Sequence, residues 1–303
     1  MKSILLFLVG FVPFFASAQL PTQFQILNNL KIAYKITLSE NRKPNEPVIV
    51  FESGLGMGGG NFETVFQYLP KDASYFVYDR NGLGESQIDP AVKTDSDVVD
   101  QLHTLLVKAK IKPPYLLVGH SIGGAFVRLF ESKYPDEVAG MVFIDPTDFM
   151  LSDVENAAAT KQSKSKIGYR ELWPKMLTDI SQDKNTPNGL RAEAERELRA
   201  SEPFFAEYQN LKPLGNIPVA VLIAYNRRSE KFEEEMNAKL GLSGKPWFKA
   251  FDDLRIEHYS KMIATNDRSF LMLLPQYSHG VHNQDPELVG NVISYIFAKA
   301  DVK

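Results

Sequence analysis

The stretch Val118-Gly-His-Ser-Ile-Gly-Gly124 decides the fold of this 303-residue chain. It follows the apolar run Tyr115–Val118, which is typical of a buried strand, and it precedes an amphipathic helical pattern. Gly119, Ser121 and Gly123 have the spacing G-x-S-x-G, which in a strand–turn–helix context marks a strained turn that exposes a serine hydroxyl. Side chains two positions before and after the serine would clash in so tight a turn, so both positions are glycine. We therefore predict that Ser121 is a catalytic nucleophile.

Short apolar runs rich in β-branched and aromatic residues recur on both sides of this stretch, and helical patterns separate them. They predict buried strands at Val48–Phe51, Tyr75–Tyr78, Tyr115–Val118, Met141–Ile144, Val219–Ile223 and Phe270–Leu274. Two earlier segments, Phe24–Leu27 and Lys31–Leu38, alternate more and flank a pair of asparagines, which indicates an antiparallel hairpin at a sheet edge. This alternation of strands and helices predicts an α/β fold with a mostly parallel, doubly wound sheet.

Residues 148–213 interrupt the alternation, because they contain no convincing strand and are rich in Lys, Glu and Ala. Arg191–Ala200 is strongly helical, and residues 183–189 have the composition of a loop. We predict a helical lid inserted between two strands, over the carboxyl ends of the sheet, where open α/β sheets bind ligands. The expected organisation is a core at 19–147 and 214–303, with the lid at 148–213.

The first residues have the pattern of a secretory signal peptide, which we assign to residues 1–18. A positive start precedes an apolar run from Ile4 to Phe15, and Ala16-Ser17-Ala18 has the small-x-small form of a cleavage site. A membrane anchor is the weaker alternative, because the run of about 12 residues is shorter than the roughly 20 that span a bilayer. We expect an exported protein, periplasmic or extracellular, without stable membrane insertion.

The composition excludes several kinds of site. The chain has no cysteine, which excludes disulfides, thiolate metal sites and a cysteine nucleophile. The formal charge is −3 with no block of like charge, so nothing indicates a nucleic-acid partner. No HExxH, EF-hand or P-loop pattern is present, and we predict neither a cofactor nor a metal.

The general base that serves Ser121 is expected on a loop after the last strand. Among the five histidines of the chain, His279 and His282 occupy such a loop. We favour His279, because it comes first after the strand and Gly280 permits a tight turn toward the serine; His282 is the alternative. We interpret His120 as a structural residue of the turn and His103 as part of a helix that packs away from the site. His258 is interpreted as part of a charged, solvated helix face.

The acid that orients the base has several candidates. Asp145 directly follows a predicted strand, and Pro146 fixes the backbone there, which suits a carboxylate that holds His279 in one tautomer. The later strand Val219–Ile223 is the usual place for the acid, but no carboxylate follows it before Glu230. We favour Asp145, and the alternatives are Glu230, Glu233 and Asp148.

Two backbone N–H groups are expected to bind the oxyanion. The N–H of Ile122 lies at the start of the helix after Ser121, where free N–H groups and a partial positive charge converge. The second donor is expected from the loop after the first parallel strand, Glu52-Ser-Gly-Leu-Gly56, and there we choose Leu55. Arg80 and the glutamate that opens this loop each end a predicted strand, and we expect them to form an ion pair that supports the loop.

A competing motif overlaps this loop. Gly54-Leu-Gly-Met-Gly-Gly59 satisfies G-x-G-x-x-G, precedes a predicted helix at Asn61–Leu69, and has Asp79 about 20 residues further on, as a dinucleotide site requires. Taken alone it indicates a nicotinamide-dependent oxidoreductase. It leaves the glycine–serine turn, the signal peptide and His279 unexplained, so we rank it far below the interpretation of Ser121 as a nucleophile.

The run from Val48 to Asp148 resembles a bacterial subfamily of the α/β-hydrolase superfamily. The segments that carry the resemblance are Glu52–Gly56, Tyr78–Ser86, Val118–Gly124, Tyr134–Gly140 and Phe143–Pro146, and Ser278–Val289 is similar to the closing histidine loop of the family. The chain departs from the family in two places: Glu52-Ser53 replaces the usual His-Gly, and no acid follows Val219–Ile223. Pancreatic-type lipases carry their acid after the earlier strand in a similar Asp-Pro context, which supports Asp145.

The resemblance implies a secreted serine hydrolase, similar to a carboxylic-ester hydrolase. It would act on an ester or related acyl bond of a small molecule through a Ser-His-Asp triad and an acyl-enzyme. A ligand-binding protein of this fold without catalysis, and a cofactor-free lyase or perhydrolase, remain alternatives. A serine at the nucleophile position disfavours epoxide hydrolase and dehalogenase chemistry. The lid aromatics are compatible with packing and with ligand contact alike, so they leave the substrate open: Tyr169, Trp173, Phe204, Phe205 and Tyr208.

Overall fold

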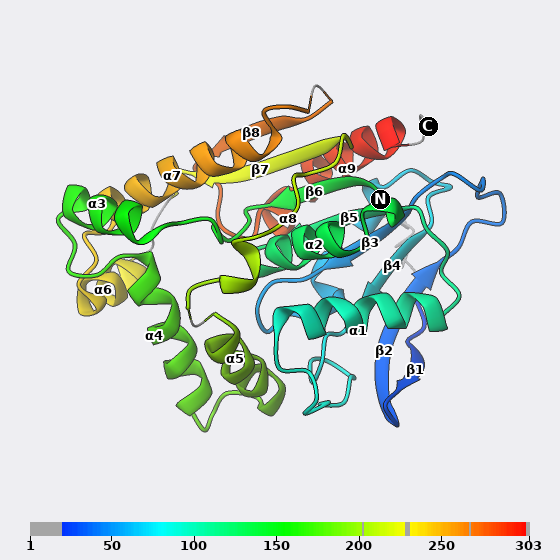
Figure 1. Ribbon diagram of the computed structural model, residues 1–303, viewed down its shortest axis with the longest axis horizontal. Coiled ribbons are helices and arrows are strands. Elements are labelled where there is room, and N and C mark those ends of the chain that lie inside the picture. Colours follow the sequence, from blue (N-terminus) through cyan, green and yellow to red (C-terminus); the bar gives the residue numbers. More distant parts are fainter. Residues whose placement is uncertain (1–19, 202, 228–230, 267, 301–303) are drawn as a thin grey trace, which may run out of the picture.

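The computed structural model describes residues 20–201, 203–227, 231–266 and 268–300, so the predicted signal peptide lies outside the described residues. A single eight-stranded sheet crosses the molecule in the order β1-β2-β4-β3-β5-β6-β7-β8 (Figure 1). The strands are β1 Gln23–Leu27, β2 Leu30–Thr37, β3 Val48–Glu52, β4 Tyr75–Tyr78, β5 Tyr115–His120, β6 Val138–Ile144, β7 Val219–Tyr225 and β8 Phe270–Pro275.

The strand pairing confirms the predicted α/β sheet. Strands β4, β3, β5, β6, β7 and β8 are parallel to one another. The hairpin of β1 and β2 is antiparallel and occupies one edge, where β2 pairs with β4. The predicted buried runs are continuous rather than alternating because helices cover both faces of a parallel sheet.

Two hydrophobic layers sandwich the sheet. On β3, Val48 and Val50 pack into one layer, and Ile49 and Phe51 into the other, as the two-residue period of a strand requires. The first layer is covered by α1 Asp95–Lys108, α2 Ile122–Lys133 and α7 Lys245–Ile263, and the second by α9 Pro286–Ala300 with the short α8 Val281–Gln284.

The chain between β6 and β7 forms α3 Asp153–Ser163, α4 Tyr169–Gln182, α5 Asn188–Ala200 and the 3-10 helix η4 Ala206–Tyr208. These helices gather at one end of the sheet, together with α6 Lys231–Leu240 (Figure 1). The strongly helical segment identified in the sequence lies within α5. Among the described residues, no helix combines the length and apolarity that a bilayer-spanning segment needs.

One predicted helix is wrong. The segment 61–69 is not an α-helix but contains two 3-10 turns, η1 Gly59–Phe62 and η2 Phe66–Tyr68. A Cβ on Gly59 would lie 3.0 Å from the backbone nitrogen of Tyr78, so η1 packs closely against β4. The remaining 3-10 helix, η3 Pro135–Glu137, leads into β6.

Candidate active site

Ser121 lies on the turn between β5 and α2, with φ 56° and ψ −124°, a backbone conformation that residues other than glycine rarely adopt. A Cβ on Gly119 would lie 2.5 Å from the carbonyl oxygen of Gly123. A Cβ on Gly123 would lie 2.3 Å from the carbonyl oxygen of Glu52 on the next strand. Both glycines are therefore required by close backbone packing around the serine, as the motif predicts.

The structure brings Ser121, His279 and Asp145 together. His279 lies on the loop between β8 and α8, and its Nε2 is 3.0 Å from Ser121 Oγ. Its Nδ1 is 2.6 Å from Oδ2 of Asp145, which is fully buried at the end of β6. Three side chains from distant parts of the sequence thus form one hydrogen-bonded series.

Asp145 is positioned by the backbone on both sides of it. Its φ is 43°, and its N–H donates to the carbonyl of Leu222 at 2.7 Å. The N–H of Thr147 donates to the carbonyl of Ser121 at 3.0 Å, which ties the loop after Asp145 to the turn that carries Ser121. One carboxylate oxygen also accepts a hydrogen bond of 3.0 Å from the N–H of Ala224 on β7.

Two arginines that the sequence interpretation missed contact the same carboxylate. Arg227 Nη2 lies 2.8 Å from Asp145 Oδ2, and Arg255 Nη2 lies 3.0 Å from Oδ1. Burial alone would raise the pKa of Asp145, but the two guanidinium groups and the hydrogen bond from His279 outweigh it and hold this pKa well below its usual range. Arg227 lies just after β7, the usual place for the acid, and this position is the sequence signal that could have identified it.

Asp148, the alternative acid, contacts a different histidine, His258. Its Oδ2 lies 2.9 Å from Nδ1 of His258 on α7, and His258 Nε2 lies 3.2 Å from Glu155 Oε1 on α3. His258 is buried, so its predicted place on a solvated face is wrong. The error arises because its helix neighbours are charged, whereas the carboxylates that face it come from other elements. Glu230 lies outside the described residues, and the described part does not include the side chain of Glu233.

His120 and His282 are buried close to His279. His120 Nε2 lies 3.0 Å from the carbonyl oxygen of His279, and burial lowers the pKa of His120 to about 3. His282, the alternative base, packs its ring 4.4 Å from that of His120 and 5.1 Å from that of Phe62. Burial lowers the pKa of His282 to about 4. Both rings are therefore neutral packing partners, and His279 is the histidine that reaches the serine.

The two expected oxyanion donors flank the nucleophile. Ile122 is the first residue of α2, so its N–H belongs to the orphan donors of a helix N-terminus. A Cβ on Gly54 would lie 3.3 Å from Ser121 Cβ, so the loop that carries Leu55 runs next to the serine. Within the described part of the chain, neither of the two N–H groups donates a hydrogen bond, which leaves both available to a ligand.

The predicted ion pair between Glu52 and Arg80 is present. Arg80 Nη1 lies 2.7 Å from Glu52 Oε1, and both side chains are buried. The Tyr78 hydroxyl donates to the second oxygen of Glu52 at 2.5 Å. The pair thus anchors the end of β3, from which the loop to Leu55 departs.

A cavity of about 510 Å³ opens in front of Ser121 and His279, within the size range of ligand sites. Its wall is formed by the loop after β3, by α4 of the lid and by α7. Eleven of the 21 lining residues are apolar or aromatic: Leu55, Met57, Pro146, Leu151, Tyr169, Leu172, Trp173, Met176, Trp247, Phe248 and Phe251. Of the lid aromatics left open by the sequence, Tyr169 and Trp173 line the cavity, whereas Phe205 is fully buried in packing.

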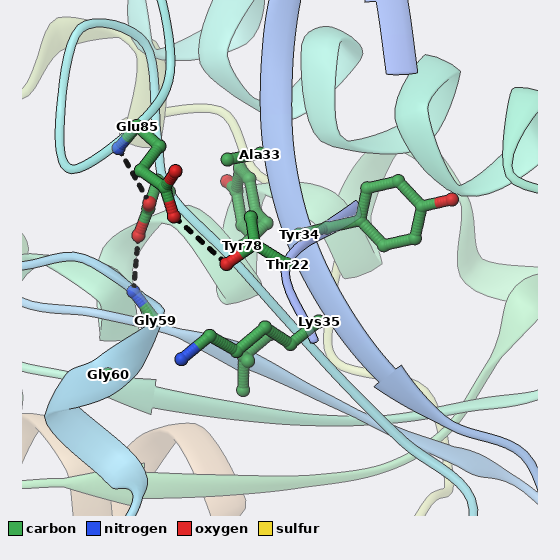
Figure 2. A pocket seen from close by; sticks show the side chains of 10 residues that line it. Thr22, Ala33, Tyr34, Lys35, Gly59, Gly60, Tyr78 and Glu85 are labelled. Atoms are coloured by element: carbon green, nitrogen blue, oxygen red, sulfur yellow. Dashed lines mark hydrogen bonds between the residues drawn. The ribbon is translucent and has the colours of Figure 1, made fainter. Parts of the chain in front are cut away.

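The dinucleotide-like motif has a structural explanation. Asp79 accepts hydrogen bonds from the N–H groups of Gly59 and Glu85, at 3.0 and 2.9 Å. Gly59 and Glu85 line a second cavity of about 210 Å³ (Figure 2). A Cβ on Gly58 or Gly84 would lie 2.3 or 2.1 Å from an oxygen of this carboxylate. Gly58, at a variable position of the motif, and Gly84, outside it, therefore make room for Asp79, which joins two loops of the protein instead of facing a ribose.

Comparisons with known proteins agree with this architecture. A family model described as alpha/beta hydrolase fold matches residues 47–256. The chain is 27% identical over 267 residues to the uncharacterized protein YqjL of Bacillus subtilis, a match that covers 86% of this chain and 88% of YqjL. It is 30% identical over 125 residues to monoglyceride lipase of Rattus norvegicus, which covers 40% of this chain and 41% of the lipase. A thermophilic esterase from Thermogutta terrifontis has the same fold, with a TM-score of 0.60 and 18% identity over 94% of this chain and 100% of the esterase.

Proposed function

The chain belongs to the α/β-hydrolase family, and on this premise we propose that it is a serine hydrolase that cleaves an ester or related acyl bond. The observation that carries the proposal is the hydrogen-bonded series from Ser121 Oγ through His279 to Asp145, with contacts of 3.0 and 2.6 Å. A nucleophile, a base in contact with it and an acid that orients the base are the three parts of this chemistry.

In the proposed reaction, Ser121 Oγ attacks the carbonyl carbon while His279 Nε2 accepts the hydroxyl proton. The oxyanion that forms accepts hydrogen bonds from the N–H groups of Leu55 and Ile122. His279 then donates its proton to the leaving oxygen, and the alcohol departs from the acyl-enzyme. Water attacks the acyl carbon as His279 removes its proton, and that proton returns to Ser121 Oγ when the acid product leaves.

Asp145 acts in this scheme mainly by orientation. Its contact at Nδ1 keeps the proton of neutral His279 on that nitrogen and leaves Nε2 free to accept the serine proton. Since Arg227 and Arg255 share its negative charge, Asp145 stabilises the imidazolium less than an unpaired carboxylate would. The arginines in return keep Asp145 ionised across the working pH range.

The lining of the cavity supports a substrate with an apolar group. Apolar surface predominates around the serine, and burial of apolar ligand surface is the main source of affinity in such pockets. Met57 and Met176 are partly exposed at the cavity, and flexible thioethers adapt to ligands of different shape. We therefore propose a small-molecule ester with an aliphatic or aromatic acyl or alcohol part.

Substitution of the nucleophile tests the proposal. Ser121→Ala removes the attacking oxygen and keeps the turn, so we expect hydrolysis of p-nitrophenyl butyrate to fall by at least about 10³-fold with an unchanged circular dichroism spectrum. His279→Ala and Asp145→Asn are expected to lose activity in the same assay. A fluorophosphonate probe is expected to label the wild type and not the Ser121 variant. Full activity in Ser121→Ala would refute the proposal, and a wild type that neither hydrolyses esters nor reacts with the probe would favour a ligand-binding protein.

A further inference from the structure

We propose that Glu193, on lid helix α5, is a positioning residue for the oxyanion loop, Glu52–Gly56. The inference rests on the proposed function, because it concerns the donor assigned to Leu55. Glu193 lies far along the chain from this loop, and the hydrolytic scheme above does not use it.

Glu193 contacts the loop and Arg80 with its two carboxylate oxygens. Its Oε2 accepts a hydrogen bond of 2.5 Å from the N–H of Gly56, and its Oε1 accepts one of 2.7 Å from Nε of Arg80. The side chain is only 4% exposed. A buried carboxylate with two charge-assisted contacts is held firmly, because each contact is stronger in a site that excludes water.

Arg80 holds the same loop from within. Its Nη1 donates to the carbonyl of Ser53, and its Nη2 to the carbonyl of Gly54, both at 2.6 Å. The ion pairs with Glu52 and Glu193, each at 2.7 Å, fix the plane of the guanidinium. The orientation of the loop carbonyls therefore depends on a group that Glu193 helps to fix.

These contacts determine the direction of the Leu55 N–H. The peptide unit that joins Gly54 to Leu55 is planar and trans, so its N–H points away from the carbonyl that Arg80 holds. The next peptide unit, from Leu55 to Gly56, is held by Glu193 through its N–H. With both adjoining planes fixed, the N–H of Leu55 has little freedom to rotate. An oxyanion donor is effective because it is oriented before the charge develops.

Packing of α5 brings Glu193 to this position. A Cβ on Gly189, near the start of the helix, would lie 1.8 Å from the carbonyl oxygen of Gly82, so backbone meets backbone there. A Cβ on Gly56, at φ 72°, would lie 2.6 Å from Cδ1 of Leu190. The helix thus rests directly on the loop, and docking of the lid completes the support of the oxyanion donor.

Glu197 provides a matched control on the same helix. It is also buried, and it pairs with Arg196 Nη2 at 3.0 Å. Arg196 in turn pairs with Asp95 on α1, so this second set of ion pairs anchors α5 to α1. Glu193→Gln and Glu197→Gln therefore make the same chemical change on one helix, with different consequences expected for catalysis.

The experiment compares E193A, E193Q and E197Q with the wild type on a p-nitrophenyl ester. We expect E193A to lower kcat by about 10- to 100-fold, part of the effect of deleting an oxyanion donor, with KM within about threefold. E193Q is expected to lose less, since its single carbonyl oxygen can accept from Arg80 or Gly56 but not from both. The affinity for a boronic acid, whose tetrahedral adduct places an oxygen in the oxyanion site, is expected to fall in parallel with kcat. E197Q is expected to keep both values within about threefold.

Equal losses of kcat and of boronic acid affinity in E193Q and E197Q would overturn the inference, because α5 would then act only as an anchor. If the wild type hydrolyses no ester and does not react with a fluorophosphonate, the proposed function fails by itself. Hydrogen exchange then tests whether Glu193 positions the loop. Faster exchange of the amides of residues 52–60 in E193Q than in E197Q supports this role, and equal exchange overturns it.

Discussion

At the scale of single residues, Asp145 makes more contacts than support of a histidine requires. Its two oxygens meet His279, Arg227, Arg255 and the N–H of Ala224, all within 3.0 Å. Replacing it leaves two arginines, one of them buried, without their shared counter-ion. Substitution of Asp145 is therefore expected to lower both activity and stability. The activity of Asp145→Asn has to be compared with that of the wild type together with the free energy of unfolding of both proteins.

His258 makes stability depend on pH in the alkaline range. Burial lowers the pKa of its imidazole, but the contacts with Asp148 and Glu155 outweigh this effect and raise the pKa to about 9. The pKa of histidine in an unfolded chain is about 6.5, so the stabilisation is fully present below that pH and is lost as pH rises through about 9. We expect Tm to fall between pH 7 and 10, and the difference in Tm between wild type and His258→Gln to narrow over the same interval.

Thermal unfolding followed by circular dichroism at several pH values checks this expectation. Other groups also titrate in this interval, but they contribute equally to both proteins. A Tm difference that stays constant from pH 7 to 10 would show that His258 is not protonated in the folded protein.

At the scale of elements, the turn between β5 and α2 tolerates no extra atom. In Gly123→Ala the new Cβ would lie 2.3 Å from the carbonyl oxygen of Glu52 and 2.7 Å from that of Ser53, both backbone atoms next to the oxyanion loop. We expect the free energy of unfolding to fall by about 1–3 kcal/mol, as for other overpacked sites, and kcat to fall with it. Urea denaturation and ester hydrolysis measure the two effects.

Gly60→Ala is the control for this substitution. Gly60 lies in η1, and a Cβ there would be 3.7 Å from its nearest neighbour, Glu63 Oε1, an ordinary contact. It is expected to keep its stability within about 0.5 kcal/mol and to keep its activity. If both variants behaved alike, the close approach of β3 to α2 would have no energetic importance.

The elements and the nucleophile turn were predictable because their signals are local. A strand that is covered on both faces has a continuous run of apolar residues in the sequence. The G-x-S-x-G motif between a strand and a helix likewise lies within a few residues. Arg227, Glu193 and the partners of His258 were not predictable, because their contacts join residues 82, 113 and 110 positions apart. The composition of α5 is that of a solvated helix, and only the fold determines which of its charges face inward.

At the scale of the whole molecule, the cavity contains both tryptophans of the chain. Trp173 on α4 and Trp247 on α7 line it, and each is nearly buried. Tryptophan fluorescence therefore reports on this site alone. When an apolar ester is titrated into Ser121→Ala, which binds without turnover, we expect the emission to change in a saturable manner.

The affinity from that titration should agree with the inhibition constant of a non-hydrolysable analogue for the wild type. Phenylalanine at Trp173 and at Trp247, one at a time, assigns the signal to the lid or to α7. Constant emission at ligand concentrations that inhibit hydrolysis would show that the ligand binds outside this cavity.

The position of the acid also has a consequence for the order in which the active site is assembled. Ser121 and Asp145 follow consecutive strands, β5 and β6, which pair directly. His279 joins them from 158 residues beyond the serine, after the lid, β7 and β8 have been added. A chain made from its N-terminus can thus bring Ser121 and Asp145 together early, whereas His279 reaches them only after β8 pairs with β7. On the proposed function, hydrolysis therefore has to wait for a late event of folding.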